Sequence, residues 1–232
     1  MEFNFAPMCG AEFLFFVRWS GGISDREYGG GPPQRTVCLL SGHGGSLGGD
    51  HRAGGHYSVL DGRPFFLSFL YALTRAANAV PELRRRLLNG QVVEFDRCCP
   101  SYTAMKDSGV YVYCLVDSGL LPYETFLTDG KRRQAEALRG DELVESGDPL
   151  SNFFVSCVPW LAYTQLKHPT TGPDDSNPRF SWGKFTEQNG RITLPVTVFV
   201  NHALADGLHI ARFYENLDRE LSDIVKIIKN SR

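Results

Sequence analysis

The sequence VNHALADGLHI, residues 200–210, marks the point where one pattern of apolar residues ends and another begins. Before it, apolar residues alternate with others along a run that ends at Val200, which predicts a strand over 192–200. After it, apolar residues recur at steps of three and four, which predicts an amphipathic helix over 210–228. His202 is therefore expected at a strand end, just before a helix. Because imidazoles titrate near neutrality, His202 is a candidate general base.

The size and composition of the chain are those of an ordinary globular protein. It has 232 residues, 42% of them hydrophobic, which suits one sizeable domain or two small ones. A formal net charge of -2 gives no reason to expect a nucleic acid as partner. No run of about 18 apolar residues predicts a membrane span. The six cysteines show neither CxxC nor zinc-binding spacing, so we expect reduced thiols in a cytoplasmic protein.

The first quarter of the chain differs from the rest. Thirteen of the 24 glycines lie between Gly21 and Gly62, and neither apolar period is sustained there. Residues 1–62 are therefore predicted to be a separate, atypical and poorly ordered segment, or the product of a reading-frame disturbance. The segment also contains His43, His51 and His56, but we do not predict a metal site there.

From residue 63 onward, helical and strand patterns follow one another. Asn189-Gly190 predicts a hairpin turn before the last strand, and Arg84 to Arg86 are expected to be solvated. Helices are expected over 64–80, from 81 to about 89, and over 123–138, the last with a possible break at Asp129-Gly130. Strands are expected over 91–96, 101–105, 110–116, 153–160, 161–164, 179–185 and 192–200. The order predicts an α+β fold, mostly antiparallel strands with helices on one face.

Residues 63–232 resemble chloramphenicol acetyltransferases. The resemblance rests on four stretches in family order: a first core helix, a serine-bearing strand, a Gly-Lys strand and a His-His-x-x-x-Asp-Gly signature. They are 63–66 with 78–83 (RPFF and NAVPEL), 152–160 (NFFVSCVPW), 180–185 (FSWGKF) and 201–207 (NHALADG).

The resemblance implies a fold, an assembly and a reaction. The fold is a two-layer α/β sandwich of the coenzyme A-dependent acyltransferase type, and the assembly is a homotrimer with active sites between subunits. The reaction moves an acetyl group from acetyl-CoA to a hydroxyl of chloramphenicol or a similar small alcohol, an activity associated with antibiotic resistance.

The resemblance also assigns roles to individual residues. His202 is similar to the general base, Ser156 to the serine that binds the oxyanion, and Ser181 to a residue that helps order water near the transition state. Lys184 and Phe185 are similar to positions near coenzyme A. Asp206 is similar to an aspartate that supports the histidine loop through an arginine.

Other residues carry open alternatives or depart from the family pattern. Tyr111, Tyr113 and Phe154 are candidates for an aromatic substrate pocket, although aromatic residues on strands are mostly core. His209 is expected to be a packing or capping residue rather than a second base. Asn201 replaces the first histidine of the family signature. The Trp-x-Arg-Lys-like start of the family is not found, so Asp206 is expected to lack its arginine.

Three functional hypotheses follow. The first is an active O-acetyltransferase, with acetyl-CoA as co-substrate and no metal. The second is a catalytically silent trimeric relative, favoured by the atypical first 62 residues. The third is a dihydrolipoamide acyltransferase core, which the absence of a lipoyl domain and an Ala/Pro-rich linker disfavours.

Overall fold

The computed structural model describes residues 36–44, 60–140, 147–163, 166–170, 172, 174–184, 186–188 and 191–231, and for 36–44, 186–188 and 191–193 the backbone alone. The helices are α1 (Phe65–Asn78), α2 (Tyr123–Arg139) and α3 (Gly207–Asn230), with short 3₁₀ helices η2 (Pro81–Arg84) and η3 (Pro149–Ser151). The strands are β1 (Thr36–Gly44), β2 (Arg85–Leu88), β3 (Gln91–Glu94), β4 (Cys99–Met105), β5 (Tyr111–Leu115), β6 (Asn152–Val158), β7 (Arg179–Gly183), β8 (Thr186–Gln188) and β9 (Arg191–Asn201).

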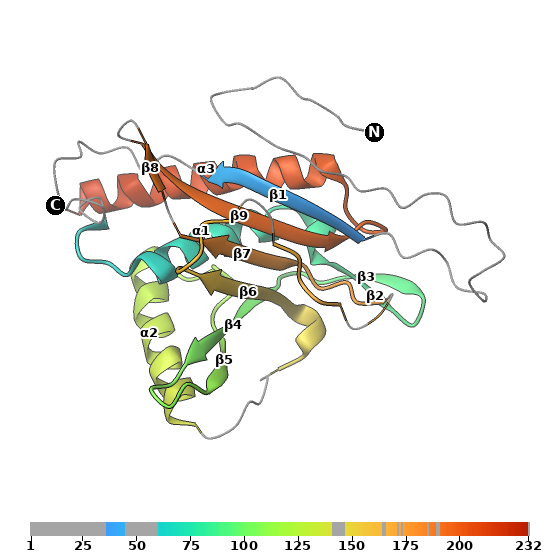
Figure 1. Cartoon of the computed structure of the whole chain (residues 1–232), viewed down its shortest axis with the longest axis horizontal. Helices are drawn as coiled ribbons and strands as arrows, with labels where there is room; N and C mark the ends of the chain where they lie inside the picture. The colour runs from blue at the N-terminus through green and yellow to red at the C-terminus, as the bar shows by residue number, and fades with distance from the viewer. Residues whose placement is uncertain are drawn as a thin grey trace.

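One mixed sheet dominates the fold (Figure 1). Its strands follow the order β1-β9-β7-β6-β4-β5, and β8 pairs with β9 outside this path. The β4–β6 and β6–β7 pairs are parallel, whereas β1–β9, β7–β9 and β4–β5 are antiparallel. The prediction of a mixed or antiparallel sheet with helices on one face is therefore confirmed.

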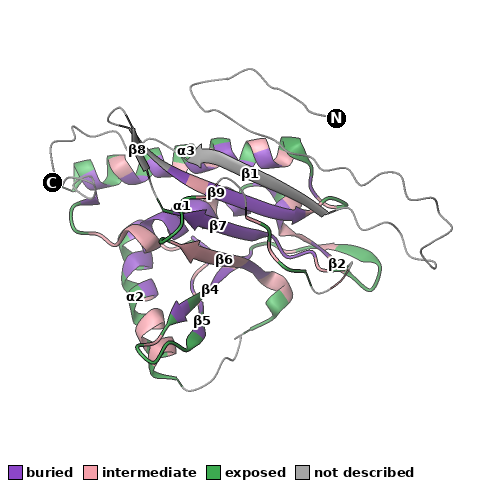
Figure 2. Ribbon diagram, viewed as in Figure 1, coloured by how far each residue is buried: buried purple, intermediate pink, exposed green. Residues whose placement is uncertain are grey.

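The core lies between this sheet and the helices, as the buried stretches in Figure 2 show. Phe180 and Trp182 of β7 point into it: the Phe180 ring lies 5.1 Å from that of Phe213 in α3, and the Trp182 ring 4.9 Å from that of Phe69 in α1. Because side chains alternate along a strand, Arg179, Ser181 and Gly183 lie on the opposite face. That second face is called the open face below.

Helix α2 continues through Asp129-Gly130, where a break was considered. A Cβ on Gly130 would come within 3.0 Å of the Leu67 side chain, so the missing side chain lets α2 approach α1 closely. This close approach explains why α2 contains a glycine, although glycine inside a helix costs about 1 kcal/mol relative to alanine.

Two predicted elements are wrong. Residues 85–88 were expected to be helical but form strand β2, paired with β3 through a turn at Asn89 and Gly90, whose φ angles are 51° and 76°. Two positive φ angles are what a tight hairpin turn requires, and Asn-Gly supplies them. Residues 161–163 form no strand, because the chain turns after β6, where the Leu161 amide donates to the Val158 carbonyl.

A strand also appears within residues 1–62, where none was expected. Strand β1 pairs antiparallel with β9, from Thr36 opposite Asn201 to Gly44 opposite Leu194, with an irregularity between Leu39 and Gly42. Residues 1–35 and 45–59, with His51 and His56, lie outside the described residues. The division of the chain at residue 62 stays a prediction.

Candidate active site

Three polar side chains stand opposite one another across β6, β7 and β9. The register places Ser156 opposite Ser181, and Ser181 opposite Thr197. The neighbours Val155, Phe180 and Val198 are buried in the core, so the three hydroxyl residues lie on the open face. The sheet therefore brings together the two serines that the sequence placed in the site.

His168 covers this row of hydroxyls. Its Nε2 is in hydrogen-bond contact with Ser181 Oγ, and Ser181 is fully buried. Burial, with the nearby Arg179 cation as a smaller cause, lowers the pKa of His168 to about 4. His168 is therefore neutral at neutral pH. The sequence analysis missed it, because a histidine in a polar loop carries no periodic signal.

A second row on the open face joins two aromatic rings through a cation. The Arg179 guanidinium lies 5.5 Å from the Phe154 ring centroid and 5.8 Å from that of Phe199. It also forms a 2.6 Å ion pair with Asp175, and both side chains are largely buried. Phe154, a predicted pocket residue, is thus half-buried beside a cation rather than in an aromatic cluster.

His202 lies just beyond the end of β9 and is exposed. Its Nδ1 is 3.1 Å from the carbonyl oxygen of Ala205. A carbonyl can only accept, so Nδ1 carries the proton and Nε2 keeps its lone pair. The arrangement leaves Nε2 as the basic nitrogen.

Asn201 organises the loop that carries His202. Its Oδ1 accepts from the Ala203 amide at 3.0 Å, and its Nδ2 donates to the Asp175 carbonyl at 3.3 Å. Its own carbonyl accepts from the amides of Leu204 and Ala205. Asn201 therefore stabilises the turn that carries His202 and connects this turn to the segment before β7.

Asp206 begins α3 as its N-cap. Its Oδ1 accepts from the Leu208 amide at 3.0 Å, while His209 Nδ1 accepts from the Asp206 amide at 3.0 Å, which completes a capping box. Within the described part of the chain, the basic side chain that lies within 4 Å of the Asp206 carboxylate is that of His209 rather than an arginine. The prediction that His209 is a capping residue is confirmed.

The base and the serines are far apart within one chain. Thr197 is opposite Ser181, and His202 follows five residues later. At about 3.4 Å per residue, that stretch of chain spans about 17 Å. Groups that act on one reacting centre must lie within hydrogen-bond reach of it, about 3 Å. His202 and Ser156 of the same chain therefore do not form one site.

The remaining predicted site residues lie at the margins of the open face. The side chain of Lys184, just after β7, is exposed, and its amide donates to the Leu161 carbonyl at 2.7 Å. Phe185 lies outside the described residues. Tyr111 and Tyr113 are 45% and 40% exposed on the edge strand β5, two strands from β6.

Gly183 allows the segment after β6 to lie directly on β7. A Cβ at this position would come within 2.5 Å of the Leu161 carbonyl oxygen and 2.7 Å of the Tyr163 ring. Tyr163 in turn accepts a 3.4 Å hydrogen bond from Thr197. Leu161, Tyr163 and His168 thus form a wall over the row of hydroxyls.

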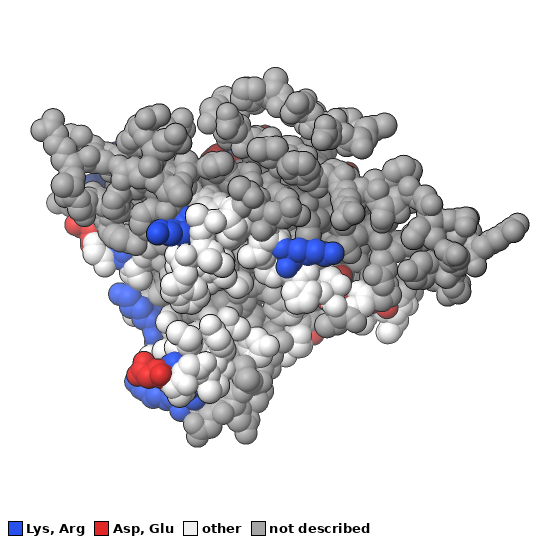
Figure 3. Space-filling view, in the orientation of Figure 1, with Lys and Arg blue, Asp and Glu red and all other residues white. Residues whose placement is uncertain are grey.

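Charged residues lie mainly at the edges of the surface seen in Figure 3. Lysines and arginines lie on both sides of a central area of other described residues, and at the lower left they lie beside an acidic residue. Within the described residues, no three His, Cys, Asp or Glu side chains gather as metal ligands. Nor does that part of the chain contain a helix that is long and apolar enough to cross a membrane.

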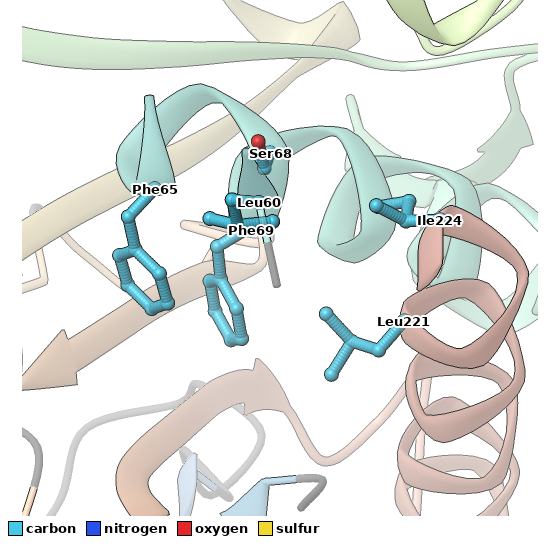
Figure 4. Close-up of a pocket in the computed structure, with 6 residues that line it drawn as sticks. All are labelled: Leu60, Phe65, Ser68, Phe69, Leu221 and Ile224. Carbon is cyan, nitrogen blue, oxygen red and sulfur yellow. The ribbon is translucent and has the colours of Figure 1, made fainter. Parts of the chain in front are cut away.

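A small apolar pocket elsewhere does not coincide with these residues (Figure 4). It lies between the start of α1 and the second half of α3, and none of the candidate site residues contributes to it. Its lining consists of Leu60, Phe65, Ser68, Phe69, Leu221 and Ile224.

Comparisons with known proteins agree with one another. The chloramphenicol acetyltransferase family matches residues 58–218. Chloramphenicol acetyltransferase 2 of Escherichia coli is 29% identical over 167 residues, 71% of this chain and 78% of that protein. The Streptomyces acrimycini enzyme is 30% identical over 164 residues, 69% of this chain and 74% of its own.

Solved structures support the same assignment. A chloramphenicol acetyltransferase superposes with a TM-score of 0.63 at 25% identity, over 82% of this chain and 88% of the other. A probable dihydrolipoamide acetyltransferase of Listeria monocytogenes shares the fold, with a TM-score of 0.57 at 13% identity. The chain therefore belongs to the chloramphenicol acetyltransferase family, whose members are acyltransferases that take the acetyl group from acetyl-CoA.

Proposed function

We propose that the protein transfers an acetyl group from acetyl-CoA to a hydroxyl of chloramphenicol or a similar small, uncharged alcohol. One observation carries the proposal: the Ala205 carbonyl holds the proton of His202 on Nδ1 and leaves Nε2 as a base at an exposed strand end. The similarity of the chain to chloramphenicol acetyltransferases supports a neutral alcohol as the acceptor.

In the first step, Nε2 of His202 takes the proton of the acceptor hydroxyl. At the same time, the oxygen of this hydroxyl attacks the carbonyl carbon of the acetyl-CoA thioester. The carbonyl π electrons move to oxygen, and Ser156 donates a hydrogen bond to this oxyanion, worth about 3–4 kcal/mol. The tetrahedral intermediate then breaks its C–S bond. The coenzyme A thiolate leaves and takes the proton from Nε2, which returns His202 to its starting form. Lys184 is an exposed cation available to a phosphate of coenzyme A.

The site forms between two copies of the chain in a homotrimer. Because about 17 Å of chain separates His202 from the serine row, His202 serves the Ser156 of a neighbouring copy. The exposed Tyr111 and Tyr113 of β5, with Trp160 after β6, are the aromatic residues available for the acceptor and the neighbouring chain.

Mixed assemblies test this arrangement. His202→Ala and Ser156→Ala chains, each nearly inactive alone, are co-expressed, and release of free coenzyme A from acetyl-CoA and chloramphenicol is measured. In randomly mixed trimers, about a quarter of the sites combine an intact His202 with an intact Ser156 of the neighbour, so about a quarter of the wild-type activity returns. Independently purified and mixed trimers that do not exchange subunits serve as the control.

Two other outcomes decide against parts of the proposal. Absence of recovered activity in verified mixed trimers contradicts the shared site. A folded wild-type trimer that binds acetyl-CoA but acetylates no alcohol contradicts the activity and identifies a catalytically silent relative. Dihydrolipoamide is tested as an alternative acceptor. Acetylation of its thiol would indicate the reaction of a dihydrolipoamide acetyltransferase in place of the proposed one.

A further inference from the structure

We infer that His209 is a positioning residue for His202, acting through the peptide group that joins Ala205 to Asp206. The inference rests on the proposed role of His202 as the base. The carbonyl of this peptide group accepts from His202 Nδ1 at 3.1 Å, and its amide donates to His209 Nδ1 at 3.0 Å. The two imidazoles thus hold opposite ends of one planar unit.

The planarity of the peptide group couples the two histidines. If the group rotates, its carbonyl and amide turn together, so His202 cannot lose its acceptor without the amide also leaving His209. The carbonyl fixes which nitrogen of His202 carries the proton, and His209 fixes the carbonyl. A hydrogen bond on the amide also polarises the carbonyl and strengthens it as an acceptor, by roughly 10–30%.

The protonation of His209 follows from its contacts. Its Nδ1 lies 3.0 Å from the Asp206 amide and 2.9 Å from Asp206 Oδ1, and these cannot both be hydrogen bonds. An unprotonated Nδ1 accepts from the amide, whereas a protonated one donates to the carboxylate and faces the amide N–H. Because the Asp206 N–H is directed at Nδ1, we assign the unprotonated Nδ1.

The far side of the His209 ring is directed at Glu82. Nε2 lies 3.6 Å from Glu82 Oε1, and both side chains are mostly buried, at 19% and 15% exposure. The second oxygen of Glu82 is buried without a hydrogen-bond partner in the described part of the chain. Glu82 belongs to η2, so His209 places the loop of the base next to the element that follows α1.

A helix cap alone would not need this arrangement. Any acceptor at the third helical position completes a capping box, and glutamate or glutamine usually does so. The imidazole instead adds a rigid ring, whose second nitrogen lies 3.6 Å from Glu82 Oε1. The orientation of the peptide group therefore does not depend on the conformation of a flexible side chain.

The test compares two substitutions of similar size at position 209. His209→Asn keeps an acceptor where Nδ1 stands, whereas His209→Leu fills the space without one. The tautomer of His202 is measured by NMR of protein labelled with ¹⁵N-histidine, and kcat and KM are measured in parallel. In the wild type and in His209→Asn, the Nδ1–H form of His202 predominates. In His209→Leu, both forms appear and kcat falls about tenfold or more with little change in KM.

Asp206→Ala is the matched control for the helix cap. It removes the carboxylate cap of α3 but leaves the amide that His209 accepts from, so His202 keeps the Nδ1–H form. A folded His209→Leu protein with an unchanged tautomer and kcat overturns the inference, and so does a folded His209→Asn protein that has lost the Nδ1–H form. The NMR result stands even if the wild type acetylates no alcohol, so failure of the proposed function is recognised separately.

Discussion

The imidazole of His168 lies directly on the hydroxyl of Ser181, with Nε2 in hydrogen-bond contact with Oγ. Ser181 is fully buried, whereas its neighbour Ser156 is only half-buried. The hydroxyl groups of Ser156 and Ser181 therefore differ in how easily a substrate can reach them.

The serines are expected to differ in their kinetic effects. Ser156→Ala should lower kcat by about 10²–10³-fold with a smaller change in KM, because it removes a donor to the oxyanion. Ser181→Ala should lower kcat less, since Ser181 acts through the position of His168. Steady-state kinetics on both variants measure the difference. An equal loss in both, or none in Ser156→Ala, contradicts these roles.

The buried imidazole of His168 should make stability depend on pH. Its pKa is lowered to about 4 in the folded protein, mainly by burial, from an ordinary value near 6.5. Between these values the unfolded chain binds more protons, so stability falls as the pH falls from about 6.5 to about 4. Allowing for the partial exposure of His168, the loss is about 1–2 kcal/mol.

Denaturant unfolding at several pH values measures this effect. His168→Gln keeps a polar atom near Ser181 but does not titrate, so its stability should change less over the same window. If the stability of His168→Gln falls with pH as steeply as that of the wild type, other groups cause the acid sensitivity.

Arg86 should be far more important for stability than an exposed arginine. Its side chain is fully buried, and burial lowers its pKa. The guanidinium donates to the carbonyls of Leu83, Arg85, Leu150 and Asn152 and to Cys98 Sγ. Arg86→Met leaves these acceptors unpaired, at about 1–3 kcal/mol each before relaxation.

We expect Arg86→Met to destabilise the protein by about 3 kcal/mol or more, measured as a lower midpoint of thermal unfolding. Arg132→Met is the control, because Arg132 is 55% exposed and its ion pairs lie on the surface of α2. It should change stability by about 0.5 kcal/mol or less. Equal effects of the two substitutions contradict the role assigned to Arg86.

Asp206 should tolerate substitution better than a buried ionic residue would. Its side chain is 55% exposed and caps α3. Asp206→Ala should cost about 1 kcal/mol, and Asp206→Asn only a few tenths, because asparagine is an equally good N-cap. A loss of about 3–5 kcal/mol in both variants, measured by unfolding, would instead indicate a buried charged partner.

The sequence predicted the parts of the fold that have a sustained period. Helix α3 and strand β9 carry long, regular apolar patterns, so both were expected close to their observed bounds. The hairpin of β2 and β3 was missed although Asn89-Gly90 is a strong turn signal, because the arginine-leucine run before it suits a helix equally well.

The site was predictable only where a motif carried it. His202, Ser156 and Ser181 were expected from their resemblance to family motifs, and the pairing of β6 with β7 brings the serines together. His168 and Arg179 were missed, because their positions depend on contacts across the sheet rather than on local pattern. Arg86 was expected in solvent, since nothing in an arginine triplet distinguishes the buried member.

The space above the serine row depends on Gly183, a residue that takes no part in the proposed chemistry. The wall over the serine row lies against β7 because this residue has no side chain, so one added methyl group would lift the wall away from the sheet. Neither Ser156 nor His202 would need to be replaced. Variants at this single position can therefore alter the space above the serine row while both proposed catalytic residues stay unchanged.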